Sequence, residues 1–210
     1  MKPFNPSTFT KACKTLAQKH RSIHSIINAY GIPRMYRRPF GFDTLVKIIL
    51  EQQVSLASGR AVYNKLQEGL GAITPQGILQ KDFCQLRELS VSRQKAGYLH
   101  HLSQMVATGY LELEKVPLQS DNEVRQSLMQ VKGIGPWTAD VVLMLCLGRT
   151  DVFPLGDVAL LNSVRHIHGK EDWPATEIGA YAECYAPYRT AAAFCYWHAY
   201  IQRKQIKPTD

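Results

Sequence analysis

The feature that most constrains this chain is a Gly-Ile-Gly turn between two helical segments. Gly133 and Gly135 frame a turn too tight for side chains, and Pro136 suits the first position of the helix that follows. Residues 122–130 have the pattern of the preceding helix. The N–H groups of the helix start and the bare glycines predict a pocket for an anion such as a phosphate. The outline is that of a helix-hairpin-helix, although an ordinary turn in a helical bundle has the same residues.

Composition favours a globular protein with a polyanionic partner. The chain has 210 residues, 45% of them hydrophobic, which is enough for one large domain or two small lobes. Its net charge of +8 and pI of about 9.3 suit nucleic acid. Neither an apolar run of membrane-spanning length nor the core of a signal peptide is visible, so we expect no membrane partner and a reducing compartment.

The cysteines predict neither a zinc site nor an iron–sulfur cluster. There are five, an odd number, and no two of them form a C-x-x-C pair. Several are expected to be buried free thiols. The histidines show no ligand pattern at helical spacing beside a carboxylate, and His100, His101, His166 and His168 are expected to be surface or packing residues.

Apolar residues recur with helical spacing along nearly the whole chain, and no strand alternation of any length appears. Helices are predicted at about residues 7–29, 42–50, 55–70 and 158–168, and from residue 90 or 92 to residue 107. Short helices are predicted to start at 75 and 82, with the hairpin at 122–148 and a final pair that includes 188–202. We therefore expect an all-α fold in which residues 1–210 form one unit. That unit has two helical lobes with a cleft between them, and the first and last helices share a lobe.

Asp157 is the residue best suited to catalysis. It precedes an apolar helical run, where Asp is a preferred N-cap, and most such aspartates do nothing else. The two roles are compatible, because a carboxylate fixed at a helix start and exposed to a cleft can meet a developing positive charge.

Several motifs in order carry a resemblance to a known family. They lie in residues 45–55 (LVKIILEQQVS), 91–96 (VSRQKA), 131–140 (VKGIGPWTAD), 151–157 (DVFPLGD) and 187–190 (PYRT), with Trp197 further on. Over residues 40–200 the chain resembles the helix-hairpin-helix (HhH-GPD) DNA glycosylase superfamily. Within it, the chain is most similar to the alkyl-purine, or 3-methyladenine DNA glycosylase II, branch in its compact form.

This resemblance implies an enzyme of base excision repair that flips a damaged nucleotide from duplex DNA and cuts the bond between base and sugar. Asp157 would be the catalytic carboxylate, stabilising an oxocarbenium-like transition state. Bifunctional relatives carry a Lys two residues after the second hairpin glycine, where this chain has Trp137. The resemblance therefore implies a monofunctional glycosylase for alkylated purines of the 3-methyladenine and 7-methylguanine type, without lyase activity.

The family also implies roles for substrate-binding residues. Trp197 matches an aromatic residue of the base pocket, and Trp137 either lies near the cleft or belongs to the core. Gln53 falls where the family places the wedge that fills the gap left by the flipped base, although a polar loop residue is the plainer interpretation. Val141 departs from the family pattern, which has a pocket Tyr there.

The hairpin is expected to bind the DNA backbone through N–H groups near Gly133, Gly135 and Thr138. The resemblance adds a monovalent cation, Na⁺ or K⁺, on the backbone carbonyls of Met129, Val131 and Ile134, with no cofactor required and no iron–sulfur cluster. The implied partner is double-stranded DNA with damaged bases, bound by a monomer. The expected location is the cytoplasm, with the nucleoid, in a prokaryote, or the nucleus in a eukaryote.

Two other functions fit the same residues. One is a glycosylase for deaminated or oxidised bases on the same fold, which the hairpin and Asp157 do not exclude. The other is a non-catalytic helix-hairpin-helix protein that binds DNA, in which Asp157 is a helix cap and nothing more.

Overall fold

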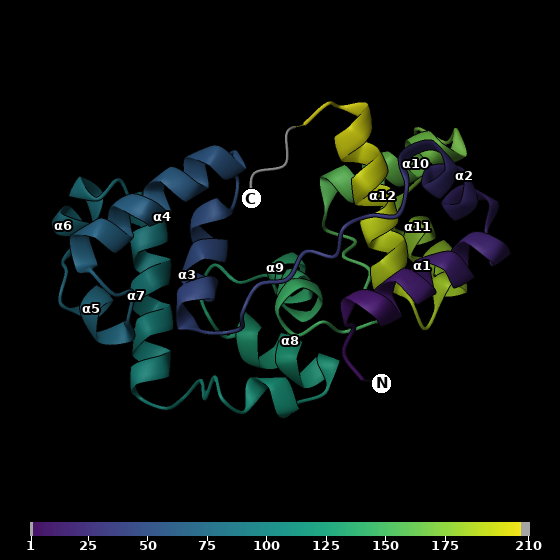
Figure 1. The fold of residues 1–210 in the computed structure, drawn as a ribbon. Helices are drawn as coiled ribbons and strands as arrows, with labels where there is room; N and C mark the ends of the chain where they lie inside the picture. Colours follow the sequence, from purple (N-terminus) through teal and green to yellow (C-terminus); the bar gives the residue numbers. More distant parts are fainter. Residues whose placement is uncertain (1, 207–210) are drawn as a thin grey trace. The chain divides into compact units, whose positions relative to one another are not determined.

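The computed structural model describes residues 2–206, and this part of the chain contains helices and loops without a strand. The predicted all-α fold class is confirmed (Figure 1). Two compact units form: unit 1 comprises residues 2–37 and 140–206 of the described chain, and unit 2 comprises residues 38–139. The first and last helices fall in unit 1. Within residues 2–206, no helix is both long and apolar enough to span a membrane.

Unit 1 is organised around its last helix. Its elements are α1 (Pro6–Lys19), α2 (Arg21–Tyr30), the π-helix η2 (Val142–Cys146), α10 (Val158–His168), α11 (Ala175–Ala182), the 3-10 helix η3 (Glu183–Tyr185) and α12 (Arg189–Arg203). Helices α1, α2 and α10 all pack against α12, which buries a continuous run from Thr190 to Tyr196. The rings of Phe9 and Phe194 meet edge to face at 5.2 Å, which joins α1 to α12.

Unit 2 is built on α3 and α7. Its elements are α3 (Phe42–Glu51), α4 (Leu56–Leu70), α5 (Pro75–Leu79), α6 (Phe83–Glu88), α7 (Arg93–Ala107), the 3-10 helix η1 (Val116–Leu118), α8 (Asp121–Met129) and the start of α9 (Pro136–Val141). Helix α3 packs against α4 and α7, and α7 also covers α5 and α6. Leu45, Ile49, Leu66 and Leu99 are completely buried, each contributing about 1.5–3 kcal/mol through removal from water.

Several helices begin at a side chain that the sequence marks as a cap. Ser55, Thr74, Asp82 and Ser92 each accept a hydrogen bond from a backbone N–H in the first turn of the next helix. This bond satisfies a donor that the helix itself leaves without a partner.

The predicted single helix over residues 7–29 is wrong. Asn5 caps α1 through a reciprocal pair with Thr8, and Pro6 occupies the first helical position. His20 then adopts an extended conformation and separates α1 from α2. Its ring packs edge to face on Tyr185 at 4.8 Å. The break therefore accompanies a contact with a residue far along the chain.

Candidate active site

The Gly-Ile-Gly turn joins α8 to α9 as the sequence predicts, and Gly133 is required there by the protein itself. Gly133 has a φ of +87°, and a Cβ built on it would lie 2.3 Å from the ring of Tyr98. A side chain at this position would both strain the backbone and displace the ring. The Ile134 N–H donates to the Val131 carbonyl at 3.0 Å and closes the turn.

Gly135 is a different case. A Cβ built on Gly135 would meet nothing within 4 Å. Its carbonyl accepts the N–H of Ala139 at 3.0 Å, which makes Gly135 the N-cap of α9. The open space beside a helix start is what close approach of a phosphate group would need.

His101 holds the turn from α7. The Lys132 N–H donates to Nδ1 of His101 at 3.1 Å, so a residue expected to be a surface or packing histidine fixes the hairpin backbone. Because the two residues are 31 positions apart, no local pattern announces this contact.

Gln52 connects the loop after α3 to the same turn. Its Nε2 donates to the Gly133 carbonyl at 2.9 Å and to the Thr138 hydroxyl at 3.0 Å. The Lys95 ammonium group donates to the carbonyls of Leu50 at 2.6 Å and Gln52 at 2.9 Å, at the end of α3. A cation is favourable at a helix C-terminus, while partial burial lowers the pKa of Lys95. Gln52 thus joins the two loops that the sequence assigns to DNA, and Lys95 holds the first of them to α7.

Gln53 stands out in that loop by its conformation. It is exposed, with a φ of +55°, in the left-handed region that residues with a Cβ rarely occupy. The neighbouring Val54 is also exposed, at 46%. The loop is held by Gln52 on the hairpin and by Lys95 on α7, and a strained, exposed residue on such a loop has the placement that a wedge needs. The wedge role of Gln53 remains a prediction.

The two other hairpin residues lie in the first turn of α9. Thr138 is buried, with its hydroxyl engaged by Gln52, and its backbone N–H precedes the first helical hydrogen bond. Trp137 is half-buried. Trp137 belongs to unit 2 whereas Asp157 and Trp197 belong to unit 1, so their combination in one substrate site remains a prediction.

In unit 1, Asp157 is the N-cap of α10. Its Oδ1 accepts the N–H of Leu160 at 2.7 Å, and its own N–H donates to the Pro154 carbonyl at 3.0 Å. The cap role is therefore confirmed. The side chain is partly exposed, and the cap bond restricts its orientation.

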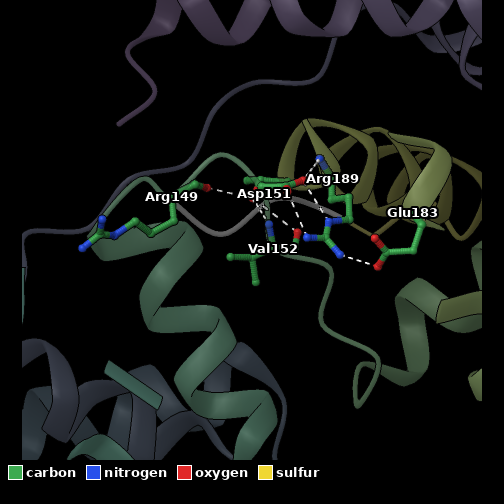
Figure 2. Close-up of polar contacts among 6 residues, drawn as sticks. Arg149, Asp151, Val152, Glu183 and Arg189 are labelled. Atoms are coloured by element: carbon green, nitrogen blue, oxygen red, sulfur yellow. Dashed lines mark hydrogen bonds and ion pairs between the residues drawn. The ribbon is translucent and has the colours of Figure 1, made fainter. Parts of the chain in front are cut away.

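The loop that leads to Asp157 is anchored by the start of α12 (Figure 2). One carboxylate oxygen of Asp151 accepts a hydrogen bond from Nε of Arg189 at 2.8 Å, and the other accepts one from Nη2 at 2.9 Å. This bidentate pairing fixes direction as well as distance, and Arg189 also pairs with Glu183.

Thr190 completes the anchor. Its buried hydroxyl accepts the N–H of Val152 at 3.0 Å and donates to the Arg149 carbonyl at 2.8 Å. The motif at residues 187–190 that carries the family resemblance therefore positions the loop before Asp157. The sequence pattern alone assigns it no such role.

Trp197 lies further along α12 and lines a pocket of about 150 Å³ in unit 1. The lining residues are Pro33, Arg34, Tyr36, Phe194, Trp197, His198, Ile201 and Gln202. Trp197 is half-buried and meets the ring of Phe194 edge to face at 5.6 Å. An engineered protein cavity of about 150 Å³ accommodates benzene, so this pocket has room for one aromatic ring. Val141 is buried and is not among its lining residues.

The predicted cation ligands are backbone carbonyls, which suit hard cations. The Val131 carbonyl accepts the Ile134 N–H and keeps a second lone pair, while Met129 is exposed. The residue types fit such an ion, whose presence stays a prediction. Between residues 2 and 206, no group of three or more His, Cys, Asp or Glu side chains is placed to hold a metal, and all five cysteines are free thiols.

Unit 2 thus has a glycine hairpin with an open helix start, and unit 1 has a carboxylate fixed at the start of another helix. The family is shown by comparison: residues 46–184 match the model of the HhH-GPD superfamily base excision DNA repair proteins. The chain belongs to this superfamily.

Individual relatives agree with this assignment. A Bacillus subtilis (strain 168) protein, YfjP, provisionally named a DNA-3-methyladenine glycosylase, is 30% identical over 167 residues, 75% of this chain but only 58% of its own length. DNA-3-methyladenine glycosylase 1 of Schizosaccharomyces pombe is 27% identical over 92% of this chain and 87% of its own. The structure of the 3-methyladenine DNA glycosylase Mag1 of that yeast with abasic DNA is similar at a TM-score of 0.81 and 26% identity, covering 95% of this chain and all of Mag1.

Proposed function

We propose that this protein is a monofunctional DNA glycosylase that excises alkylated purines, of the 3-methyladenine and 7-methylguanine type, in base excision repair. The observation that carries the proposal is Asp157, which is held at the start of α10 by its cap bond to Leu160. The loop before it is fixed by Arg189 and Thr190. Membership of the superfamily and the names of the relatives support the substrate class.

The chemistry follows from the charge of the substrate. An alkylated purine already carries a positive charge, so the glycosidic electron pair moves to the base, and the base leaves without a strong general acid. The sugar becomes oxocarbenium-like, and the Asp157 carboxylate stabilises that charge. Water then adds to the anomeric carbon and loses a proton, leaving an abasic site and a free base.

Recognition divides between the two units. In unit 2, the hairpin around Gly135 holds the backbone without reading sequence, and Gln53 fills the space that the flipped nucleotide leaves. In unit 1, Trp197 stacks on the extruded base, because aromatic faces favour cationic rings. The protein acts as a monomer, and a monovalent cation on the carbonyls of Met129, Val131 and Ile134 steadies the hairpin.

The test is base release from three sets of duplexes that carry alkylated, deaminated or oxidised bases. The proposal predicts release from the alkylated set, and release confined to either other set would overturn the substrate class. Absence of release from all three, with intact DNA binding, would favour the non-catalytic alternative. Borohydride added during turnover should trap no protein–DNA adduct, because Trp137 occupies the position of the Schiff-base lysine.

A further inference from the structure

The net positive charge of the protein is concentrated at one end of the sequence. All 17 acidic residues follow Phe42, whereas 8 of the 25 Lys and Arg residues precede Asp43. The remaining 168 residues therefore hold 17 basic and 17 acidic residues and have no net charge. The whole formal charge of +8 resides in the first 42 residues. Such asymmetry is typical of a surface that binds a polyanion.

Part of this charge is used inside the protein. In unit 1, Arg37 donates to the carbonyls of Phe4 at 2.9 Å and Cys146 at 3.2 Å. In unit 2, Arg38 pairs with Glu51 at 2.6 Å. Arg37 and Arg38 of the connector between α2 and α3 thus stabilise the fold, whereas Arg34 of the same connector is exposed.

Half of the eight basic residues before Asp43 are exposed on α1 and α2. Lys11, Lys14, Lys19 and Arg21 are all exposed, and none of them forms an ion pair within the part of the chain that the structure describes. We call these four residues the α1–α2 basic surface. Neither helix contains an acidic residue. Glu183, the neighbour in sequence of the Cys184 that contacts His20, pairs with Arg189, which it shares with Asp151.

The solvent faces of the two helices suit a phosphate backbone. Along α1, Ser7, Lys11, Lys14 and Gln18 are exposed at helical spacing, opposite the buried Phe9, Cys13 and Leu16. Along α2, Arg21, His24, Ser25 and Asn28 form a similar exposed stripe opposite Ile23 and Ile26. Lys, Arg, Ser, Asn and Gln are the side chains that contact phosphate and sugar oxygens in protein–DNA complexes.

We propose that the α1–α2 basic surface is a second, sequence-independent contact with the duplex backbone, separate from the hairpin. It rests on the proposed function, because a DNA repair protein must find a rare lesion among undamaged sites. The surface holds the protein on undamaged duplex through counterion release and takes no part in breaking the glycosidic bond.

The test compares a triple variant, Lys11→Gln, Lys14→Gln and Lys19→Gln, with a control that loses the same charge elsewhere, Lys81→Gln, Lys115→Gln and Lys170→Gln. Affinity for an undamaged duplex is measured over a series of salt concentrations. Each lost phosphate contact should reduce the slope of log affinity against log salt by about 0.9, up to about 2.7 for three. The control should keep the wild-type slope.

Circular dichroism and thermal melting establish that both variants fold. An unchanged slope in the triple variant, or an equal reduction in the control, would overturn the proposal. Loss of binding to vesicles of anionic lipid with DNA binding intact would overturn it as well, in favour of a membrane surface. Single-turnover excision at saturating enzyme should match wild type in both variants. This readout separates failure of the second contact from failure of the glycosylase assignment, since a protein without excision activity can still show the salt effect.

Discussion

At the scale of the residue, Gly133 and Gly135 are glycines for different reasons. The positive φ of Gly133 and the Tyr98 ring against it belong to the protein's own structure, whereas a Cβ on Gly135 would have no heavy atom within 4 Å beyond its neighbours in the chain. The first position is explained by the fold, and the proposed contact with a DNA phosphate would explain the second. This difference makes Gly135 the cleaner position for testing DNA contact.

Gly135→Asp should weaken binding to every duplex, damaged or not, while the protein stays folded. Asp is a favourable N-cap for α9, so its stability should hold, but its charge repels the phosphate. Gly135→Asn, which caps as well without a charge, is the matched control and should retain more affinity. Duplex affinity is measured by fluorescence anisotropy. A folded Gly135→Asp protein with wild-type affinity would contradict the proposed contact between the hairpin and DNA.

Replacing Trp197 distinguishes a role in the base pocket from a role in the core of unit 1. As a pocket residue, its replacement by Ala should lower excision of alkylated purines by the equivalent of about 1–3 kcal/mol of lost stacking, with little change in melting temperature. As a core residue, the same change should destabilise unit 1 by about 3–5 kcal/mol and impair every property together. Trp197→Phe retains an aromatic ring and should recover part of the activity. Excision that survives in the folded fraction despite a large stability loss would reject the pocket role.

At the scale of the element, Gln52 and Gln53 form a natural pair for comparison. Gln52→Ala removes two hydrogen bonds to the hairpin turn and should cost about 1–3 kcal/mol, because partly buried groups lose their partner. Gln53→Gly relieves a left-handed conformation that costs about 1–2 kcal/mol for a residue with a Cβ. It should therefore raise stability while lowering excision through loss of the wedge. Urea unfolding should show lower stability for Gln52→Ala and higher stability for Gln53→Gly, and single-turnover assays should show the loss of excision in Gln53→Gly. Equal destabilisation by both changes would contradict these roles.

The sequence predicts elements well where the signal is local. The caps at Ser55, Thr74, Asp82 and Ser92 bond three residues ahead, so a short window contains both partners. The break at His20 involves Tyr185, and Gln52 reaches the hairpin across 81 positions. These long-range contacts leave no trace in local periodicity, which is why one helix was expected where two form.

The same limit applies to the candidate site. Asp157 and Gly135 belong to recognisable local patterns, whereas the anchoring of the Asp157 loop by Arg189 and Thr190 spans 38 residues and more. His101 supports the hairpin in the same way. Residues in direct chemical roles are therefore easier to predict from sequence than residues that position them.

At the scale of the whole molecule, a buried polar chain gives unit 1 a pH-dependent stability. Hydroxyl contacts run from Ser22 through Tyr185 to Tyr196, whose hydroxyl meets Nε2 of His168 at 2.8 Å. These residues come from α2, η3, α12 and α10, so this series of hydrogen bonds connects four elements of unit 1. Burial, with a smaller effect of Lys170, lowers the pKa of His168 below its ordinary value.

The sign of the effect follows from proton uptake. As pH falls below about 6.5, the unfolded chain protonates His168 first, and the folded protein does so only at its lower pKa. Stability should therefore decrease through this window and level off below it. His20, whose pKa is also lowered, adds in the same direction. His168→Gln, which keeps hydrogen-bonding capacity without titrating, should show a shallower decrease in urea unfolding between about pH 7.5 and about pH 5. An identical decrease in both proteins would exclude His168 as a source.

The central claim is that Asp157 performs the chemistry as well as capping α10. Single-turnover release of 7-methylguanine by wild type and by Asp157→Asn tests it most directly, because Asn caps a helix about as well as Asp. Asp157→Asn should have near wild-type melting and duplex binding, and its excision rate should fall by at least about 100-fold, the scale of one lost electrostatic stabiliser. Asp151→Asn, which alters the other carboxylate of the same loop, should reduce stability and leave far more activity. A folded Asp157→Asn protein that excises the base at close to the wild-type rate would contradict the account.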